Sequence, residues 1–104
     1  MFIHVDSYNK FLLTLTDTSN LVLFDFYTSK FLKAVKLKGK VIAIRPAKHS
    51  QLIGISFNKG VVEIWDLELL KNVRRKDIAA VANDLVFTPD SKKVILAGKC
   101  FIKL

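Results

Sequence analysis

Short hydrophobic runs recur along the whole chain, and clusters of polar turn residues separate them. Three pairs of such runs lie on either side of a short turn: FLLTLT with LVLFDF, LIGISF with VVEIWDL, and KVILAG with CFIKL. The turns between them are at 17–20, 58–60 and 98–99. Runs rich in Val, Ile and Phe around Gly, Asn, Asp or Ser are typical of β-hairpins. The pattern therefore predicts three hairpins and an all-β fold.

Further strand-like segments flank these hairpins. FIHVDS, VIAIRP and NDLVFTP precede the three hairpins in turn, and FLKAVKL and LKNVRR follow the first two. The prediction is eleven strands in groups of four, four and three. One segment, residues 67–76, could instead form a helix with Leu67, Leu70 and Val73 on one face. Its position directly after a Trp-Asp pair favours a turn and a strand.

The hairpins are copies of one repeat. Phe24-Asp25 precedes Trp65-Asp66 by 41 residues, and Pro46 precedes Pro89 by 43 residues. The segment FIKL takes the place in the third copy that VEIWDL takes in the second. A constant period of this length indicates a repeat architecture.

The residues of this repeat resemble those of WD40-repeat proteins. GVVEIWDLELLK looks like the third strand of a WD40 repeat and the turn that follows it. LVFTPDSKKVILAG is similar to the family's first strand, its Pro-Asp turn and its second strand, and NLVLFDFYTSKFLKAV to the passage from third to fourth strand. The observed spacing also matches the family's period of about 40–45 residues. The resemblance extends over residues 2–104.

The resemblance implies a β-propeller built from blades of four antiparallel strands, of which this chain supplies about two and a half. Blade 1 is expected at about 1–39, blade 2 at about 40–80 and an incomplete blade 3 at about 81–104. Propellers of this family close with about six to eight blades. We expect the apolar faces at the two ends to be covered by further blades of a longer polypeptide, by copies of the chain, or by another protein. The stop at FIKL favours the first arrangement.

The resemblance also implies structural roles for a few residues. In the family an aromatic residue on the third strand wedges between blades, and the Asp after it caps the turn. A Pro-Asp pair shapes the turn between the first and second strands. The residues at these places are Phe24, Asp25, Trp65, Asp66, Pro89 and Asp90. The places of the family's network Ser and Asp in blade 2 hold Phe57 and Lys59, so we expect hydrophobic packing to replace that network.

The net charge of +8 and the sequence pI of about 9.8 favour acidic partners. Lysines alternate along residues 30–40, where a solvated edge that resists aggregation is the simpler explanation. The candidate partner-binding residues lie instead in and beside two predicted turns. They are Arg45, Lys48, His49, Arg74, Arg75 and Lys76.

Little in the sequence suggests catalysis. The acidic residues fall singly, Cys100 is the only cysteine, and His4 and His49 have no companions at metal-ligand spacing. The sequence contains no Gly-rich phosphate loop or nucleophile elbow. We therefore expect no catalytic, cofactor or metal site. The sequence also has no signal peptide and no apolar run of the roughly 20 residues that a membrane helix needs. An intracellular location is expected, cytoplasmic or, in a eukaryote, nuclear.

Two functions fit these features. The first is a non-catalytic scaffold that binds other proteins and organises a multi-protein complex. The alternative is a nucleic-acid-associated module of a ribonucleoprotein, with basic loops on phosphates. Binding to phosphates weakens steeply with salt, which separates the two. The scaffold is preferred because the Phe residues alternate as core residues do, without the mixture of aromatic and basic residues that single-strand binding needs.

Overall fold

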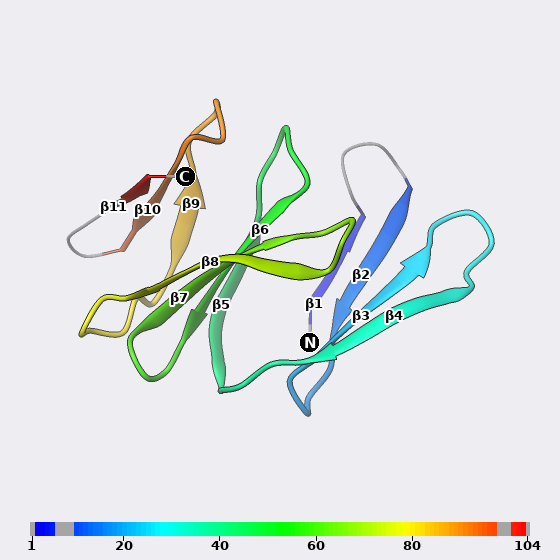
Figure 1. The fold of residues 1–104 in the computed structure, drawn as a ribbon, viewed down its shortest axis with the longest axis horizontal. Coiled ribbons are helices and arrows are strands. Elements are labelled where there is room, and N and C mark those ends of the chain that lie inside the picture. Colours follow the sequence, from blue (N-terminus) through cyan, green and yellow to red (C-terminus); the bar gives the residue numbers. More distant parts are fainter. Residues whose placement is uncertain (1, 6–9, 98–100, 104) are drawn as a thin grey trace.

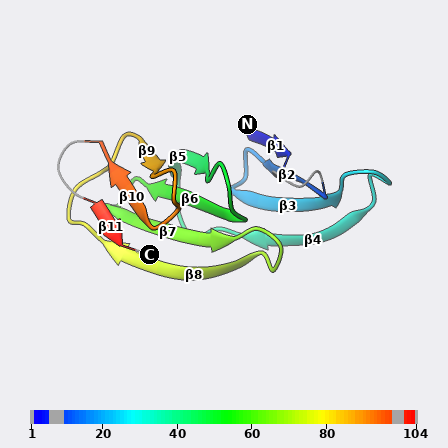
Figure 2. The ribbon, with the colours of Figure 1, turned by 90° about the horizontal axis from the view of Figure 1, so that it is seen from above.

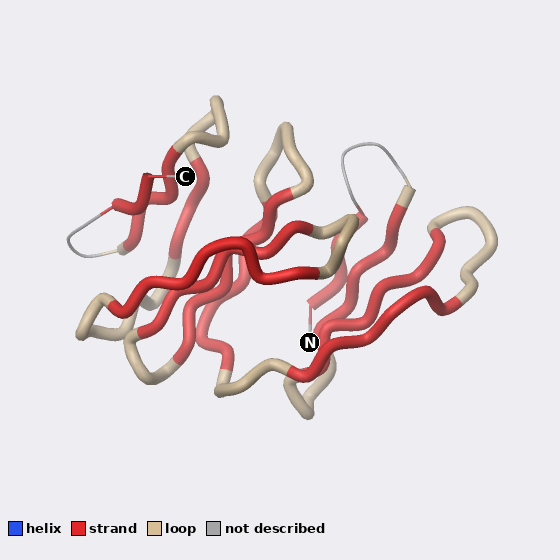
Figure 3. Tube along the Cα trace, viewed as in Figure 1, coloured by secondary structure: helices blue, strands red, loops and turns tan. Residues whose placement is uncertain are grey.

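A computed structural model describes residues 2–5, 10–97 and 101–103 of the chain. All regular elements in these residues are β-strands, as Figure 3 shows, and the described part contains no helix that could cross a membrane. The strands are β1 (Phe2–Val5), β2 (Phe11–Leu15), β3 (Asn20–Asp25), β4 (Phe31–Lys36), β5 (Val41–Pro46), β6 (Leu52–Phe57), β7 (Val61–Asp66), β8 (Lys71–Asp77), β9 (Leu85–Phe87), β10 (Lys93–Leu96) and β11 (Phe101–Lys103). The all-β prediction is confirmed, and the segment that could have been a helix forms a turn and β8.

The strands form three antiparallel sheets in which each strand pairs with its neighbours in sequence. The first sheet has the order β1-β2-β3-β4, the second β5-β6-β7-β8 and the third β9-β10-β11. The three sheets lie next to one another, with the second between the other two (Figures 1 and 2). This is the arrangement of successive propeller blades, with β1, β5 and β9 on one side and β4 and β8 on the other.

The two central strands of the second sheet, β6 and β7, are buried on both faces, and the strand pleat explains how. Successive side chains of a strand point to opposite faces. On β6, Ile53, Ile55 and Phe57 join a core shared with the first sheet, whereas Gly54 approaches Leu85 of the third sheet. Strands buried on both faces consist of nearly continuous hydrophobic residues. This agrees with LIGISF and VVEIWDL, which place apolar residues on both faces of β6 and β7.

Two hydrophobic cores result, one on each face of the second sheet. The first junction, between the first and second sheets, contains Leu13, Leu21, Leu23, Leu37, Ile53, Ile55, Phe57, Val61, Trp65, Leu67 and Leu70. The second junction, between the second and third sheets, contains Ala47, Val62, Ile64, Ala82, Leu85, Phe87, Val94 and Leu96. Burial of these side chains is the main favourable contribution to folding, at about 25 cal/mol per Å² of apolar surface.

The outer sheets each leave one face open. In the third sheet, Val86 and Ile95 are cross-strand partners, 56% and 48% exposed, on the face opposite the second junction. In the first sheet, Phe24 pairs with Phe31 across β3 and β4 with their rings edge to face at 6.3 Å, and Phe31 is 60% exposed. Each end of the described assembly therefore presents apolar side chains to solvent.

The turns that follow β3 and β7 are built alike. The carboxylates of Asp25 and Asp66 each accept the backbone amide three residues further on, at 2.8 and 2.9 Å. The next residue, Ser29 or Leu70, has a left-handed φ of 59° or 49°. A leucine in this conformation is strained. Leu70 is nevertheless almost fully buried in the first junction, so packing holds it there.

Candidate functional site

The six basic residues singled out from the sequence do not form one surface. Arg45 lies on β5 and Lys48 and His49 in the exposed turn after it, whereas Arg74, Arg75 and Lys76 lie on β8. β5 and β8 are the opposite edges of the second sheet. With strands about 4.8 Å apart, two intervening strands separate these edges by roughly 14 Å. The group at β5 and the group on β8 therefore do not form one binding surface.

Arg45 is engaged within the chain. Its Nε and Nη2 donate to Oδ1 and Oδ2 of Asp84 at 2.9 and 3.0 Å, a two-point ion pair that joins the second and third sheets. The hydrogen bond from Arg45, together with the Leu85 amide, lowers the pKa of Asp84. The pair is about half exposed, so water screens it. Arg45 therefore contributes to how the sheets are joined, and Lys48 and His49 remain exposed beside it.

The basic run on β8 is divided by the strand pleat. Arg75 is the cross-strand partner of Glu63, on the face that looks toward the first sheet. Arg74 and Lys76 are opposite Ile64 and Val62, which belong to the second junction, so these two basic side chains emerge on the other face. The three consecutive basic residues of β8 therefore belong to two different surfaces of the sheet.

The turn between β9 and β10 contains Pro89 and Asp90. Asp90 Oδ1 accepts the Thr88 hydroxyl at 2.6 Å and the Lys92 amide at 3.0 Å. These bonds lower the pKa of Asp90, the hydroxyl having the larger effect. The Asp90 carboxylate therefore stabilises the turn.

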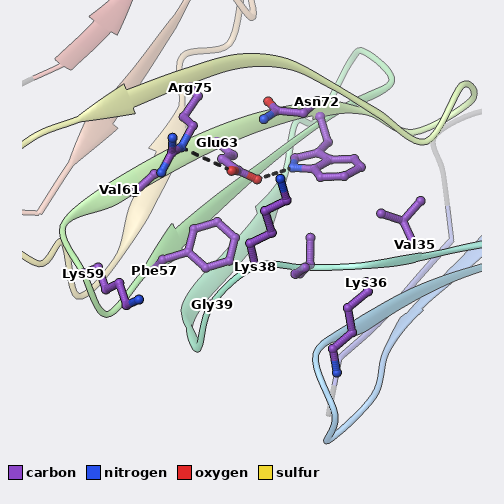
Figure 4. A pocket seen from close by; sticks show the side chains of 12 residues that line it. Val35, Lys36, Lys38, Gly39, Phe57, Lys59, Val61, Glu63, Asn72 and Arg75 are labelled. Carbon is purple, nitrogen blue, oxygen red and sulfur yellow. Dashed lines mark hydrogen bonds and ion pairs between the residues drawn. The ribbon is translucent and has the colours of Figure 1, made fainter.

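Where the first junction reaches the outer strands it opens into a groove with a cavity of about 340 Å³. Figure 4 shows it between the end of β4 with the link to β5 and the outer half of the second sheet. Its apolar walls are Val35, Leu37, Phe57, Val61 and Trp65. Its charged and polar rim contains Lys36, Lys38, Lys59, Glu63, Asn72 and Arg75. The volume is at the lower end of the roughly 300–1,000 Å³ typical of ligand pockets.

A chain of polar contacts lines one wall of the groove. The indole Nε1 of Trp65 donates to Oε1 of Glu63 at 2.9 Å, and Arg75 Nε lies 3.6 Å from Oε2 of the same carboxylate (Figure 4). Trp65 is 8% exposed, whereas the Arg75 side chain is 65% exposed. Glu63 thus satisfies the indole N–H of Trp65. Its carboxylate orients the arginine at the mouth of the groove.

The charge around the groove is unbalanced. Four cationic side chains surround one carboxylate, which gives a formal charge of +3. Lys36 Nζ donates to the Thr18 carbonyl at 2.6 Å. Lys38 and Lys59 form no ion pair with any described residue. A single carboxylate without a nearby acid or base provides no acid–base pair, and three potential metal ligands gather nowhere in the described residues. The arrangement suits binding of an anionic group next to an apolar one.

Among the rim and wall residues, the sequence predicted a binding role for Arg75 and a packing role for Trp65. Phe57 and Lys59 were identified only as replacements in the family's network. The lysines at 30–40 were interpreted as a solvated edge, although Lys36 and Lys38 lie at the groove. Glu63 received no role, although its position two residues before Trp65 put it on the same face of a predicted strand. Cys100 and the turn at 98–99, also considered from the sequence, lie outside the described residues.

Comparisons with known proteins support the fold. No protein-family model matches the sequence, and no curated protein matches it either. Among solved structures, the chain is similar to the β-propeller domain of Cps50 (Swd1) from Myceliophteria thermophila, with 15% identity and a TM-score of 0.72 over 91% of this chain and 31% of that one. It is also similar to the hydrazine synthase of Kuenenia stuttgartiensis, with 14% identity and a TM-score of 0.72 over 91% of this chain and 28% of that one. The chain thus spans about a third of each propeller-containing neighbour and has the fold of consecutive propeller blades.

Proposed function

We propose that this chain is a non-catalytic scaffold, a section of a β-propeller that binds other proteins and organises a multi-protein complex. The observation that carries the proposal is the open apolar face on each outer sheet. Phe31 on one side and Val86 with Ile95 on the other remain exposed, while both faces of the central strands β6 and β7 of the second sheet are covered. Exposed apolar side chains grouped on a sheet face mark a protein-interaction surface.

The partner at these faces is another blade, because a sheet of the same kind already covers each face of the second sheet. Such blades belong to a longer polypeptide, to further copies of the chain or to a different protein. All three require the same surface chemistry. The similarity to Cps50 (Swd1) supports a propeller of about three times this length. The scaffold function itself rests on the open faces and not on that neighbour.

The test is the native mass of the purified chain over a range of concentrations, by size-exclusion chromatography with light scattering. We expect association that grows with concentration and that the exposed-position variant Ile95→Lys weakens by removing apolar contact area and adding a charge. Lys92→Glu, a surface change in the turn before β10, is the control and leaves association unchanged. A chain that stays monomeric at all concentrations excludes further copies as the partner. Association that Ile95→Lys and Lys92→Glu weaken equally contradicts a role for the open face.

The alternative function, nucleic-acid binding through basic loops, is supported by the net charge of +8. It is weakened by the placement of the candidate residues. Arg45 is paired with Asp84, and the remaining basic residues are distributed over two edges and two faces of the second sheet. A steep loss of RNA binding between low and physiological salt, with several phosphate contacts released, would instead favour this function.

A further inference from the structure

The groove at the first junction combines two features that a merely solvated edge does not need. Its walls are apolar and enclose a cavity of about 340 Å³, and cations surround its mouth. Val35 and Leu37 close it from the side of the first sheet, whereas Phe57, Val61 and Trp65 close it from the second. Cavities with apolar walls and a few polar groups at the mouth are the usual form of a ligand site.

The cationic side chains at the groove indicate the charge of the ligand. Lys38 points across the groove in the direction of Glu63, while Lys36 and Lys59 point outward at its ends (Figure 4). Glu63 supplies one negative charge against four cationic side chains at the groove, so the net formal charge at the mouth stays positive. Any group that enters between these side chains meets positive potential. The ligand is therefore anionic near the mouth and apolar where it reaches Trp65.

The edge of the second sheet selects a peptide among anionic ligands. β8 is the outermost strand of its sheet in the described chain, and it contributes Asn72 and Arg75 to the groove. An outermost strand presents unpaired backbone N–H and C=O groups, to which an extended peptide can add as a further strand. A nucleic acid has no such complement, and the walls offer no aromatic face with adjacent cations for base stacking, because Trp65 is almost fully buried.

We propose that this groove binds an acidic protein segment that carries one apolar side chain. The apolar side chain occupies the cavity against Trp65, and the flanking carboxylates of the segment contact Lys38, Lys59 and Arg75. The proposal rests on the proposed scaffold function, since it names the kind of partner that the scaffold holds. It concerns a surface distinct from the open sheet faces.

Trp65 is the single tryptophan of the chain and forms part of the cavity wall, so its fluorescence reports on this site alone. The probe is a short synthetic peptide with one leucine flanked on each side by glutamates. We expect a saturable shift of the Trp65 emission. The same peptide with serine in place of leucine, and the same peptide with glutamines in place of glutamates, are expected to bind at least about tenfold more weakly because each lacks one of the two contacts.

Two variants of the protein locate the binding. Lys38→Glu reverses one rim charge at an exposed position and is expected to weaken binding about tenfold. Lys48→Glu makes the same change in net charge at the opposite edge of the sheet and is expected to leave binding unchanged. Val35→Phe fills the cavity from the first sheet and is expected to abolish the leucine dependence. Circular dichroism and thermal unfolding verify that each variant is folded.

The outcomes separate this proposal from the scaffold function. No change of Trp65 emission with the leucine–glutamate peptide overturns it, as does equal weakening by Lys38→Glu and Lys48→Glu. Stronger binding of an oligouridylate, competing at the same site, assigns the groove to nucleic acid and also overturns it. If the groove binds nothing while the chain still associates through Ile95, only the groove proposal fails. If the peptide binds and Ile95→Lys weakens association no more than Lys92→Glu does, the groove stands and the proposed use of the open faces fails.

Discussion

The second sheet meets its two neighbours in different ways. At the second junction Gly54 lets Leu85 come close, Ser56 Oγ donates to the buried Ala82 carbonyl at 2.6 Å, and a two-point ion pair closes the inner edge. At the first junction the inner half is equally apolar, but the outer half opens into the groove. Across this junction Lys33 Nζ donates to the Leu69 carbonyl at 2.9 Å, at an exposed position.

The difference between the two junctions indicates which residues produce a groove between packed sheets. The second sheet takes part in both junctions, and its partner has four strands at the first junction and three at the second in the described residues. The closed junction has a small residue, Gly54, where the facing side chain must approach. The open one has Glu63 on the groove face of β7, where an apolar side chain would have continued the core. We infer that Glu63, a polar residue at this position of β7, interrupts the apolar packing of the first junction where the groove opens.

The largest expected effect comes from removing a core side chain at either junction. Ile55→Ala at the first junction and Ile64→Ala at the second each delete a fully buried isoleucine. Each is expected to lower the free energy of unfolding by about 2–5 kcal/mol. Urea unfolding followed by far-UV circular dichroism measures both. A single transition that both variants shift shows that the two junctions fold together, and two separate transitions would contradict this.

A smaller effect tests how tightly each junction is closed. A Cβ at Gly54 would lie 2.5 Å from Leu85 Cδ1 and 3.3 Å from a ring carbon of Phe87. Gly54→Ala is therefore expected to destabilise by about 1–3 kcal/mol, since Leu85 has little room to move in a packed core. Gly39→Ala is the matched substitution at the groove, where the Cβ would lie 3.1 Å from Phe57 Cδ1. It should cost less, because Phe57 borders a cavity. Equal losses in thermal unfolding would show that the groove is as rigid as the closed junction.

The smallest expected effect is on the loss of folding stability at acidic pH. The pKa of Asp84 is lowered in the folded chain, first by the hydrogen bond from Arg45. A lowered folded pKa stabilises the protein above the unfolded value of about 4, and this contribution is lost as pH falls through the folded pKa. Asp84→Asn is expected to make stability less dependent on pH below about pH 4. Denaturation curves between neutral pH and pH 2 measure it, with Lys59→Gln, an exposed change that adds no carboxyl group, as the control. An unchanged acid slope in the asparagine variant would contradict a role for this ion pair.

Local patterns in the sequence were sufficient for the strands and for the propeller resemblance. Hairpins depend on neighbouring residues, so alternating Val and Ile around Asn58-Lys59-Gly60 predicted β6 and β7, and Gly60 indeed has the positive φ of 80° that such a turn needs. The groove could not be predicted in this way. Its walls come from Val35 and Trp65, which are 30 residues apart and meet only when two sheets pack.

The basic residues illustrate the same limit. The pairing of Arg45 with Asp84 joins positions 39 apart in sequence, and no local signal marks it. The division of the run on β8 depends on its register against β7, in which a β-bulge shifts the pairing between Ile64 and Trp65. Composition predicted a basic protein correctly, but the surface to which each cation belongs is set by pairing and packing.

The uninterrupted meander of the three sheets has a consequence for how the chain reaches this structure. Each described strand pairs only with strands adjacent in sequence, so every ladder closes over a short loop at small entropic cost. Contacts distant in sequence are needed only where sheets pack, which favours rapid formation of hairpins and later docking of the sheets. The middle sheet gains two docking partners and the outer ones only one each. Amide protons of β6 and β7 are therefore the slowest to exchange with solvent, and the structure frays from its two ends inward.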